Sequence, residues 1–240
     1  MKPKYLKAIL FIAVISITVL SSCRIGCIKG SGHQVTESHK FSEFTRIEIS
    51  GGFKVNLKQD SSLGVSITAD DNLMKYIHST VDGDRLHIYT RKNLCGSGEM
   101  VINIGVKNLE ELKGSGAVEF ISDGKLVTKN LRLGLTGASK VNMDLNAADV
   151  NTEGSGSTEI ILKGQASSHN INLTGSGKVN AFDFVVGNYN IETTGASDCE
   201  INVLHELTVH STGASDVKYR GNPTSVNSSK TGASSVTKVN

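Results

Sequence analysis

The chain has 240 residues, with 25 Lys and Arg against 23 Asp and Glu, and a formal net charge of +2. Only 5% of the residues are aromatic and none is Trp, so the basic and aromatic clusters of a nucleic-acid-binding surface are missing. The 25 Gly against only 2 Pro are unusual, and because the glycines recur at regular spacing they exclude a merely flexible Gly-rich chain.

Residues 1–22 read as a secretory signal. Three lysines give a positive start, and Ala8–Leu20 is a largely apolar run of 13 residues. A helix of that length is too short for a bilayer core, which needs about 20 residues, but it fits the ~7–15 apolar residues of a signal peptide. Without the three lysines the formal net charge falls to −1, so the basic balance belongs partly to the signal.

The signal ends in Leu20-Ser21-Ser22-Cys23, which resembles a bacterial lipobox. The resemblance implies that Cys23 receives the lipid and becomes the new N-terminus. Several acyl chains, at ~0.8 kcal/mol per buried CH₂, would then hold the protein at a membrane without a spanning helix. We therefore expect an exported lipoprotein, most simply of the outer membrane; the alternative is an ordinary signal with an incidental Cys.

Residues 23–40 are expected to form a flexible tether, because Gly30-Ser31-Gly32 is typical of one. Three cysteines remain beyond the lipid site: Cys27, Cys95 and Cys199. Export permits disulfides, and a bond between Cys27 and Cys95 is conceivable, but spacing alone does not decide the pairing.

Residues 41–107 predict an N-terminal β section that either caps the following repeats or begins them. Alternating apolar residues indicate strands, and Asp82-Gly83 is a hairpin signal. The expected elements are strands at 46–50, 53–57 and 65–68, a short helix at 71–77 and a hairpin at 81–88.

Residues 108–240 contain seven copies of a short small-residue motif in which a lead glycine is followed by Ser or Ala. The lead glycines are spaced 23, 17, 21, 20, 18 and 19 residues apart, and a period near 20 marks a repeat architecture. The lead glycines are Gly114, Gly137, Gly154, Gly175, Gly195, Gly213 and Gly232.

Each copy alternates apolar and polar residues after its glycine, as a strand with one buried face does. Four residues after the lead glycine stand Val118, Val141, Thr158, Val179, Cys199, Val217 and Val236. One copy is too small to bury its apolar face, whereas stacked copies share a core. We therefore predict an all-β fold: a parallel β-helix or β-solenoid of ~20-residue coils. Cys199 takes a Val position and is expected to be a buried small hydrophobe, and the polar last copy reads as an end cap.

Asp198 and Asp216 are the weak metal candidates. Both lie three residues after a lead glycine in adjacent copies, so stacking would bring their carboxylates to ~5 Å. Such a pair suits a cation with oxygen ligands or an acid–base couple, but the preferred interpretation is solvated surface acids. His205 and His210 are too unfavourably spaced along a strand to share a metal without a bend. We expect no catalytic residue and no cofactor.

The chain resembles the bacteroidete family described as putative auto-transporter adhesin, head GIN domain. The residues that carry the resemblance are the Cys23 leader, the segment Ile47-Glu48-Ile49-Ser50-Gly51-Gly52-Phe53-Lys54-Val55 and the seven glycine copies. It implies an all-β, β-helix-like fold and a place in the bacterial cell envelope, and it transfers no catalytic motif.

From these features we expect a non-enzymatic envelope lipoprotein with a binding or adhesion role. Its partners would be the membrane, through the lipid, and a glycan or protein surface; nucleic acid is excluded. The alternatives are a carbohydrate-active β-helix enzyme and a structural protein that self-assembles into homo-oligomers. Arg24 and Ile25 lack the acidic run that often marks surface export, so a periplasmic and a surface-exposed position both stay open.

Overall fold

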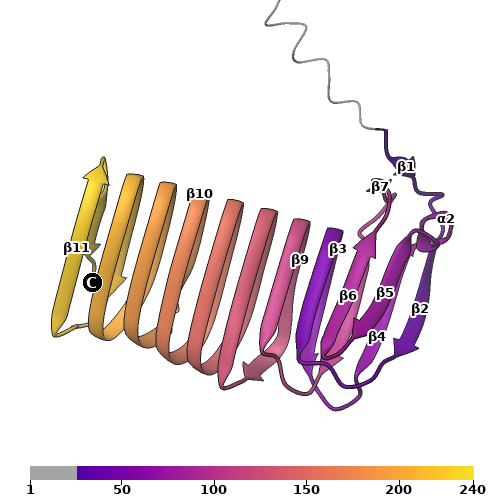
Figure 1. Ribbon diagram of the computed structural model, residues 1–240, viewed down its shortest axis with the longest axis horizontal. Coiled ribbons are helices and arrows are strands. Elements are labelled where there is room, and N and C mark those ends of the chain that lie inside the picture. Colours follow the sequence, from indigo (N-terminus) through magenta and orange to yellow (C-terminus); the bar gives the residue numbers. More distant parts are fainter. Residues whose placement is uncertain (1–25) are drawn as a thin grey trace, which may run out of the picture.

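The computed structural model describes residues 26–240. The predicted signal and Cys23 lie outside the described residues. The described chain is all-β apart from one short helix, and Figure 1 shows it as a long row of stacked strands with a mixed section at one end. No helix in residues 26–240 is long and apolar enough to cross a membrane.

The elements divide into an N-terminal section and a repetitive section. The first comprises β1 (Ile28–Lys29), β2 (Gln34–Lys40), β3 (Arg46–Gln59), β4 (Gly64–Asp70), α2 (Asp71–Met74), β5 (Ile77–Asp82), β6 (Arg85–Thr90), β7 (Leu94–Cys95) and β8 (Val101–Val106). The second comprises β9 (Glu111–Val127), β10 (Asn130–Arg220), β11 (Ser225–Gly232) and β12 (Ser235–Lys238).

The main sheet is mixed, and its two regions differ in strand direction. Its order is β11-β10-β9-β3-β8-β4-β2, and β1 pairs with β7 in a separate two-stranded sheet. From β3 to β12 through β9 and β10 the pairs are parallel. The antiparallel pairs, β2–β4, β4–β8 and β5–β6, all belong to the N-terminal section. The predicted repeats are therefore a parallel stack, next to a section with mixed pairing.

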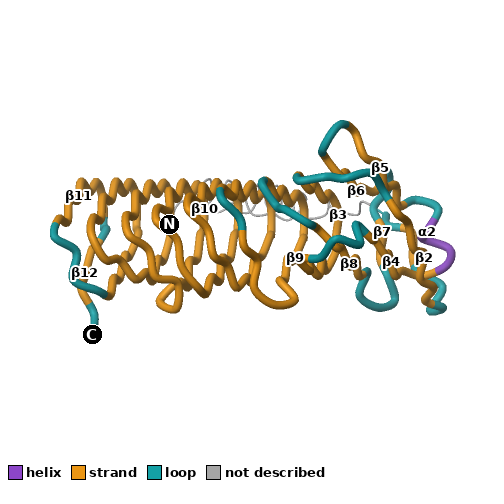
Figure 2. The backbone as a smooth tube through the Cα atoms, turned by 90° about the horizontal axis from the view of Figure 1, so that it is seen from below, coloured by secondary structure: helices purple, strands orange, loops and turns teal. Residues whose placement is uncertain are grey.

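β10 is continuous over 91 residues, and Figures 1 and 2 show its successive stretches lying side by side in a regular row. We call the stretch from one stacked glycine to the next a pass, and a ladder of glycines links successive passes. A Cβ added to Gly137 would lie 2.7 Å from the carbonyl oxygen of Gly116, and one added to Gly156 would lie 2.7 Å from that of Gly137. The same contact continues through Gly175, Gly195, Gly213 and Gly232.

The ladder glycines combine a close backbone approach with a left-handed conformation. Their φ angles run from 88° at Gly137 to 119° at Gly195 and Gly213, a region that only glycine enters at little cost. Every ladder position thus requires a residue without a Cβ. This requirement explains why glycine recurs once in each pass.

The ladder corrects the predicted register in two copies. The stacked glycines are Gly116 and Gly156, not Gly114 and Gly154, and the spacings become 21, 19, 19, 20, 18 and 19 residues. Val141 accordingly pairs with Phe120 and not with Val118. The extra glycine has a packing role, because a Cβ on Gly114 would lie 2.7 Å from the Phe120 ring.

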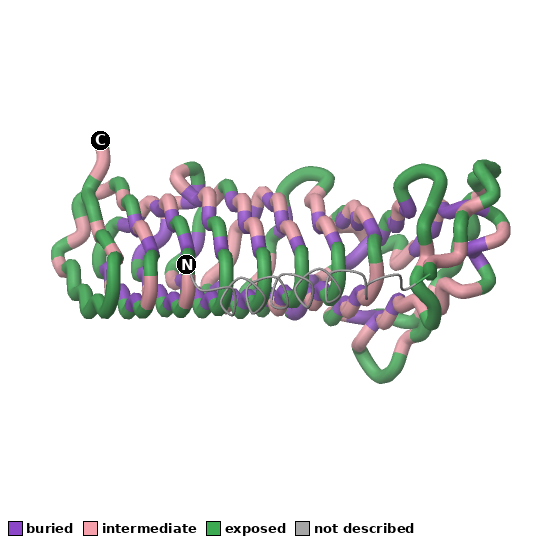
Figure 3. Tube along the Cα trace, turned by 90° about the horizontal axis from the view of Figure 1, so that it is seen from above, coloured by how far each residue is buried: buried purple, intermediate pink, exposed green. Residues whose placement is uncertain are grey.

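The core is continuous along the stack. Val141, Val179 and Val217 are each 0% exposed, so they face inward as the repeat pattern predicts. Buried and exposed residues alternate along the passes in Figure 3. The shared core includes Phe53, Ile88 and Ile102 of the N-terminal section, and the two sections therefore bury one apolar interior.

The N-terminal section confirms most of its predicted elements. β3 covers both strands expected at 46–50 and 53–57, β4 covers the strand at 65–68, and β5 and β6 form the hairpin around Gly83, whose φ is 59°. The predicted helix at 71–77 is shorter in the structure, where α2 ends at Met74.

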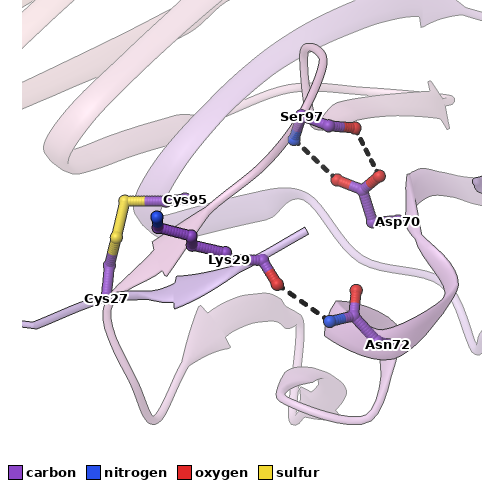
Figure 4. Close-up of a disulfide and its surroundings, with 6 residues drawn as sticks. All are labelled: Cys27, Lys29, Asp70, Asn72, Cys95 and Ser97. Atoms are coloured by element: carbon purple, nitrogen blue, oxygen red, sulfur yellow. Dashed lines mark hydrogen bonds between the residues drawn. A yellow bond between two sulfur atoms is a disulfide. The ribbon is translucent and has the colours of Figure 1, made fainter. Parts of the chain in front are cut away.

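Much of the range assigned to a flexible tether is ordered. β1 and β2 occupy residues 28–29 and 34–40, and β2 pairs with β4 along its whole length. Cys27 is disulfide-bonded to Cys95, with Cα atoms 5.6 Å apart. Asp70 accepts a hydrogen bond from the Gly32 backbone nitrogen at 3.0 Å and is itself held by the Ser97 backbone nitrogen at 2.8 Å and hydroxyl at 2.5 Å (Figure 4). Contacts with residues distant in sequence thus hold this segment, and local composition does not reveal them.

The last repeat is polar, and its outer edge has no partner strand within residues 26–240. β11 and β12 each pair with β10 only, and every residue from 226 to 232 is exposed. Lys230 lies in register with the buried Ser211, and Lys238 with Tyr219, so charged residues take positions that are apolar or small in earlier passes.

Candidate functional site

One outward side of the stack carries a column of hydroxyl groups. The residue before each ladder glycine is Ser or Thr, and the parallel register aligns these residues from strand to strand. Neighbouring strands are ~4.8 Å apart, so the hydroxyls repeat at that interval. The column consists of Ser50, Ser115, Thr136, Ser155, Thr174, Thr194, Thr212 and Thr231.

Two further polar columns run beside the hydroxyl column. The nearer one consists of Glu48, Lys113, Gly134, Glu153, Asn172, Glu192, His210 and Ser229. The farther one consists of Arg46, Glu111, Arg132, Asn151, Asn170, Asn190, Thr208 and Asn227. Within it the Asn170 amide donates to the Asn151 side-chain oxygen at 3.0 Å. We call these three columns together the polar face.

The polar face is hollowed where Gly134 interrupts its middle column. A groove of about 450 Å³ is lined there by Glu48, Lys113, Thr136, Glu153 and Asn172, together with neighbouring residues. Because Gly134 has no side chain, the space between Lys113 and Glu153 stays open. The lining offers an ammonium, carboxylates, an amide and hydroxyls at once, which suits a ligand with several hydrogen-bonding groups.

A buried carboxylate fixes the charged edge of this groove. Glu111 is 5% exposed, and its oxygens lie 2.6 Å from Arg85 Nη2 and 3.1 Å from Lys113 Nζ. Arg85 also donates to Glu48 Oε2 at 3.1 Å. Burial opposes the charge of Glu111, but hydrogen bonds from Lys113 and Arg85 outweigh it and lower the pKa of the carboxyl. Glu48 and Lys113 are thus held in place by one charged network.

Sequence reasoning missed this network for an identifiable reason. Glu111 and Arg85 come from β9 and β6, which both pair with β3, and their sequence separation hides the contact. Glu111 lies in register with the exposed Arg46 and Arg132, so the alternation of the strand predicts an outward, solvated residue and gives no signal of its burial.

The opposite side of the glycine ladder carries a ladder of charges. With the corrected register, Lys140 lies between Glu119 and Glu159, at 4.0 and 3.3 Å. The column reads Lys54, Glu119, Lys140, Glu159, Lys178, Asp198, Asp216 and Ser235. A second groove of about 530 Å³ lies along it. The sequence placed Glu119 and Glu159 in another column, because it took the wrong glycine as the start of those copies.

Asp198 and Asp216 do share this column, as expected. Asp198 is exposed, and Asp216 accepts a hydrogen bond from Ser235 and lies 3.6 Å from Lys218. Over residues 26–240 no three His, Cys, Asp or Glu side chains gather as metal ligands would. The pair therefore forms the acidic end of a charge ladder, and nothing further collects around it.

The remaining candidates separate into buried and exposed groups. Cys199 is 1% exposed, and burial raises the pKa of its thiol to about 12, which leaves it unreactive. His205 and His210 are exposed. His169, which the sequence did not single out, is 0% exposed and hydrogen-bonded to the Thr152 hydroxyl at 2.9 Å; burial lowers its pKa to about 3.

A protein-family model matches most of the chain. The model of the family described as "Putative auto-transporter adhesin, head GIN domain" matches residues 43–223. This range contains the polar face from Glu48 to Thr212 and most of the glycine ladder. None of the curated proteins compared with the chain matches it.

Solved structures share the fold at low sequence identity. A Bacteroides fragilis protein described as a putative adhesin is 22% identical, with a TM-score of 0.84 over 88% of this chain and 100% of its own. A putative adhesin from Parabacteroides merdae is 22% identical, with a TM-score of 0.69 over 89% and 99%. A Parabacteroides distasonis protein described as a putative lipid binding protein is 22% identical, with a TM-score of 0.73 over 90% and 100%.

Proposed function

Because this chain belongs to the family described as "Putative auto-transporter adhesin, head GIN domain", we propose that it is a cell-envelope lipoprotein that binds a surface ligand without catalysis. The proposed binding surface is the polar face, with the groove at Gly134 as its centre. The proposed ligand is rich in hydrogen-bonding groups, as a glycan or a polar protein surface is.

The observation that supports this proposal is the charged network under the groove. Glu111 is nearly inaccessible to solvent and orients Lys113 and Arg85, and through Arg85 also Glu48. A side chain that is already fixed loses less conformational entropy when a ligand binds. Charge-assisted hydrogen bonds are also the stronger ones. A network of this kind is therefore suited to recognition.

The repetition of the polar face supports adhesion over tight binding of a single small molecule. The same hydroxyl and amide columns pass through successive strands, so a long ligand could make the same weak contact many times. Linked weak contacts raise overall avidity by orders of magnitude. We propose that the passes form a β-solenoid of ~20-residue coils, which would keep the columns straight and their spacing constant.

The proposed location is the outer membrane, through a lipid on Cys23. The Cys27–Cys95 disulfide supports export, because disulfides persist in oxidising compartments. Mass spectrometry of the N-terminal peptide tests the acylation. Surface-protease treatment of whole cells distinguishes a surface-exposed position from a periplasmic one.

Binding to glycan and extracellular-matrix arrays tests the function. We expect the wild-type protein to bind at least one class of ligand, and Glu48→Gln combined with Lys113→Gln to weaken that binding at least tenfold, because both edges of the groove lose their charge. Glu119→Gln combined with Lys140→Gln is the matched control, since it removes the two ion pairs of Lys140 on the charge ladder and leaves the groove unchanged.

Two array results would count against the proposal. An equal loss of affinity in both double variants would show that the ligand does not bind specifically in the groove. Release of shortened glycans from the array would point to a carbohydrate-active enzyme instead.

A further inference from the structure

At the end of the molecule opposite β11, a short chain segment that leads to the proposed lipid site lies beside positively charged side chains without ion-pair partners. β1, β7 and α2 lie together there (Figure 1). Cys27 immediately precedes β1 and is bonded to Cys95 of β7. The site of the proposed lipid, Cys23, is only four residues before Cys27, and four residues span at most ~14 Å. If Cys23 is acylated, this end of the molecule is forced close to the bilayer.

Main-chain contacts gather four exposed basic residues at this end. Lys29 pairs with Cys95 in the β1–β7 sheet, and its carbonyl oxygen accepts a hydrogen bond from Asn72 at 2.8 Å (Figure 4). Lys75 directly follows α2 as its C-cap. Arg91 and Lys92 precede β7, and the Arg91 backbone nitrogen lies 3.4 Å from the Tyr76 carbonyl oxygen. We call Lys29, Lys75, Arg91 and Lys92, all exposed, the basal patch.

The basal patch has a surplus of positive charge. Within residues 26–240 none of its four side chains forms an ion pair. Two adjacent acids, Asp70 and Asp71, accept hydrogen bonds from Ser97 and Ser31 and keep their negative charge, so the four basic residues leave a formal surplus of +2. The patch therefore has charge left over for an external partner.

We propose that the basal patch is a membrane-docking surface that binds anionic lipid headgroups beside the acyl anchor. This inference rests on the proposed acylation of Cys23. A basic residue near an anionic bilayer contributes about a fivefold gain in affinity, or about 1 kcal/mol. Four such residues alone bind an anionic bilayer weakly, but the short segment between an acylated Cys23 and Cys27 gives them a high effective concentration at the bilayer surface. The Lys75 ammonium lies 5.2 Å from the centroid of the Tyr76 ring, and tyrosine is enriched at the headgroup level of membranes.

Docking is measured with the mature chain from Cys23 onward, carrying Cys23→Ser so that no acyl chain contributes. We expect it to co-sediment with vesicles of phosphatidylcholine and phosphatidylglycerol at millimolar lipid, and not with pure phosphatidylcholine. The variant with Lys29, Lys75, Arg91 and Lys92 all changed to Gln should lose at least tenfold in affinity. The matched control changes four exposed lysines of the repeats to Gln: Lys125, Lys163, Lys178 and Lys230.

Retained binding in the control supports a local surface, because both variants change net charge equally. Equal loss in the two variants, or equal binding to both vesicle types, overturns the proposal, as does the absence of wild-type binding. Acylation is read separately, from the N-terminal mass of full-length protein purified from membranes. A missing acyl group would refute the lipoprotein proposal without altering the vesicle result.

Discussion

At the scale of single residues, His169 is the clearest case in which burial decides chemistry. Its ring packs edge-on to Phe184 with centroids 5.8 Å apart, and Thr152 supplies a hydrogen bond at 2.9 Å. With no carboxylate among these contacts, desolvation favours the neutral ring and lowers its pKa from 6.5 to about 3. His169 is therefore a structural residue that penalises folding in acid.

The sign of this penalty gives a pH-dependence prediction. The unfolded chain binds a proton at His169 below about pH 6.5 and the folded chain only near pH 3, so its contribution to stability is complete above pH 6.5 and is lost as pH falls toward 3. The loss amounts to at most about 5 kcal/mol. We expect His169→Gln to flatten the decline in unfolding free energy between pH 6.5 and 4, measured by urea titration, whereas the exposed His210→Gln leaves it unchanged. Parallel curves for all three proteins would contradict this.

At the scale of the element, the glycine ladder determines how one strand pass lies on the next. Register follows from the glycine with positive φ, and not from the first glycine of each motif: Gly116 stacks under Gly137, while Gly114 makes room for Phe120. A shift of two residues keeps each side chain on its own face of the strand, since side chains alternate with period two. The sequence thus predicted the buried face correctly despite the wrong register.

Substitution of two nearby glycines, Gly137 in the ladder and Gly134 outside it, tests whether the ladder contacts stabilise the fold. Gly137 has a φ of 88° and an added Cβ would lie 2.7 Å from the Gly116 oxygen, whereas at Gly134 the nearest atom would be the flexible Lys113 side chain at 3.2 Å. We expect Gly137→Ala to cost about 2 kcal/mol of unfolding free energy and Gly134→Ala less than about 0.5 kcal/mol. Chemical denaturation measures both. Similar losses would mean that the ladder does not govern stability.

At the scale of the whole molecule, the parallel stack behaves as repeated layers on a mixed base. Each pass contacts mainly the passes before and after it, so stability should be close to a sum over passes and their interfaces. The N-terminal section differs: antiparallel pairs, the Cys27–Cys95 bond and the Asp70–Ser97 contact hold it together, and β3 joins it to the repeats by pairing with β9.

Interchangeable layers lead to a deletion test. Removing residues 157–175, the 19 residues from one ladder glycine to the next, should leave a protein that still unfolds cooperatively, with Tm lowered by a few degrees. Removing 157–166 should abolish folding, because a deletion of about half a repeat would place Gly175 beside the middle of the preceding strand and not beside its ladder glycine. Calorimetry and circular dichroism distinguish the two. A cooperative fold for the shorter deletion would refute layer-by-layer register.

The sequence by itself determined the all-β class, the family, the glycine period and the inward Val141, Val179 and Val217, because alternation and turn chemistry are local properties. Only the tertiary structure decided which glycine stacks, that Cys27 bonds Cys95, that residues 34–40 form a strand, and that Glu111 joins Arg85 to Lys113. These features depend on contacts between residues tens of positions apart. Spacing along the chain does not specify such contacts until the passes are stacked.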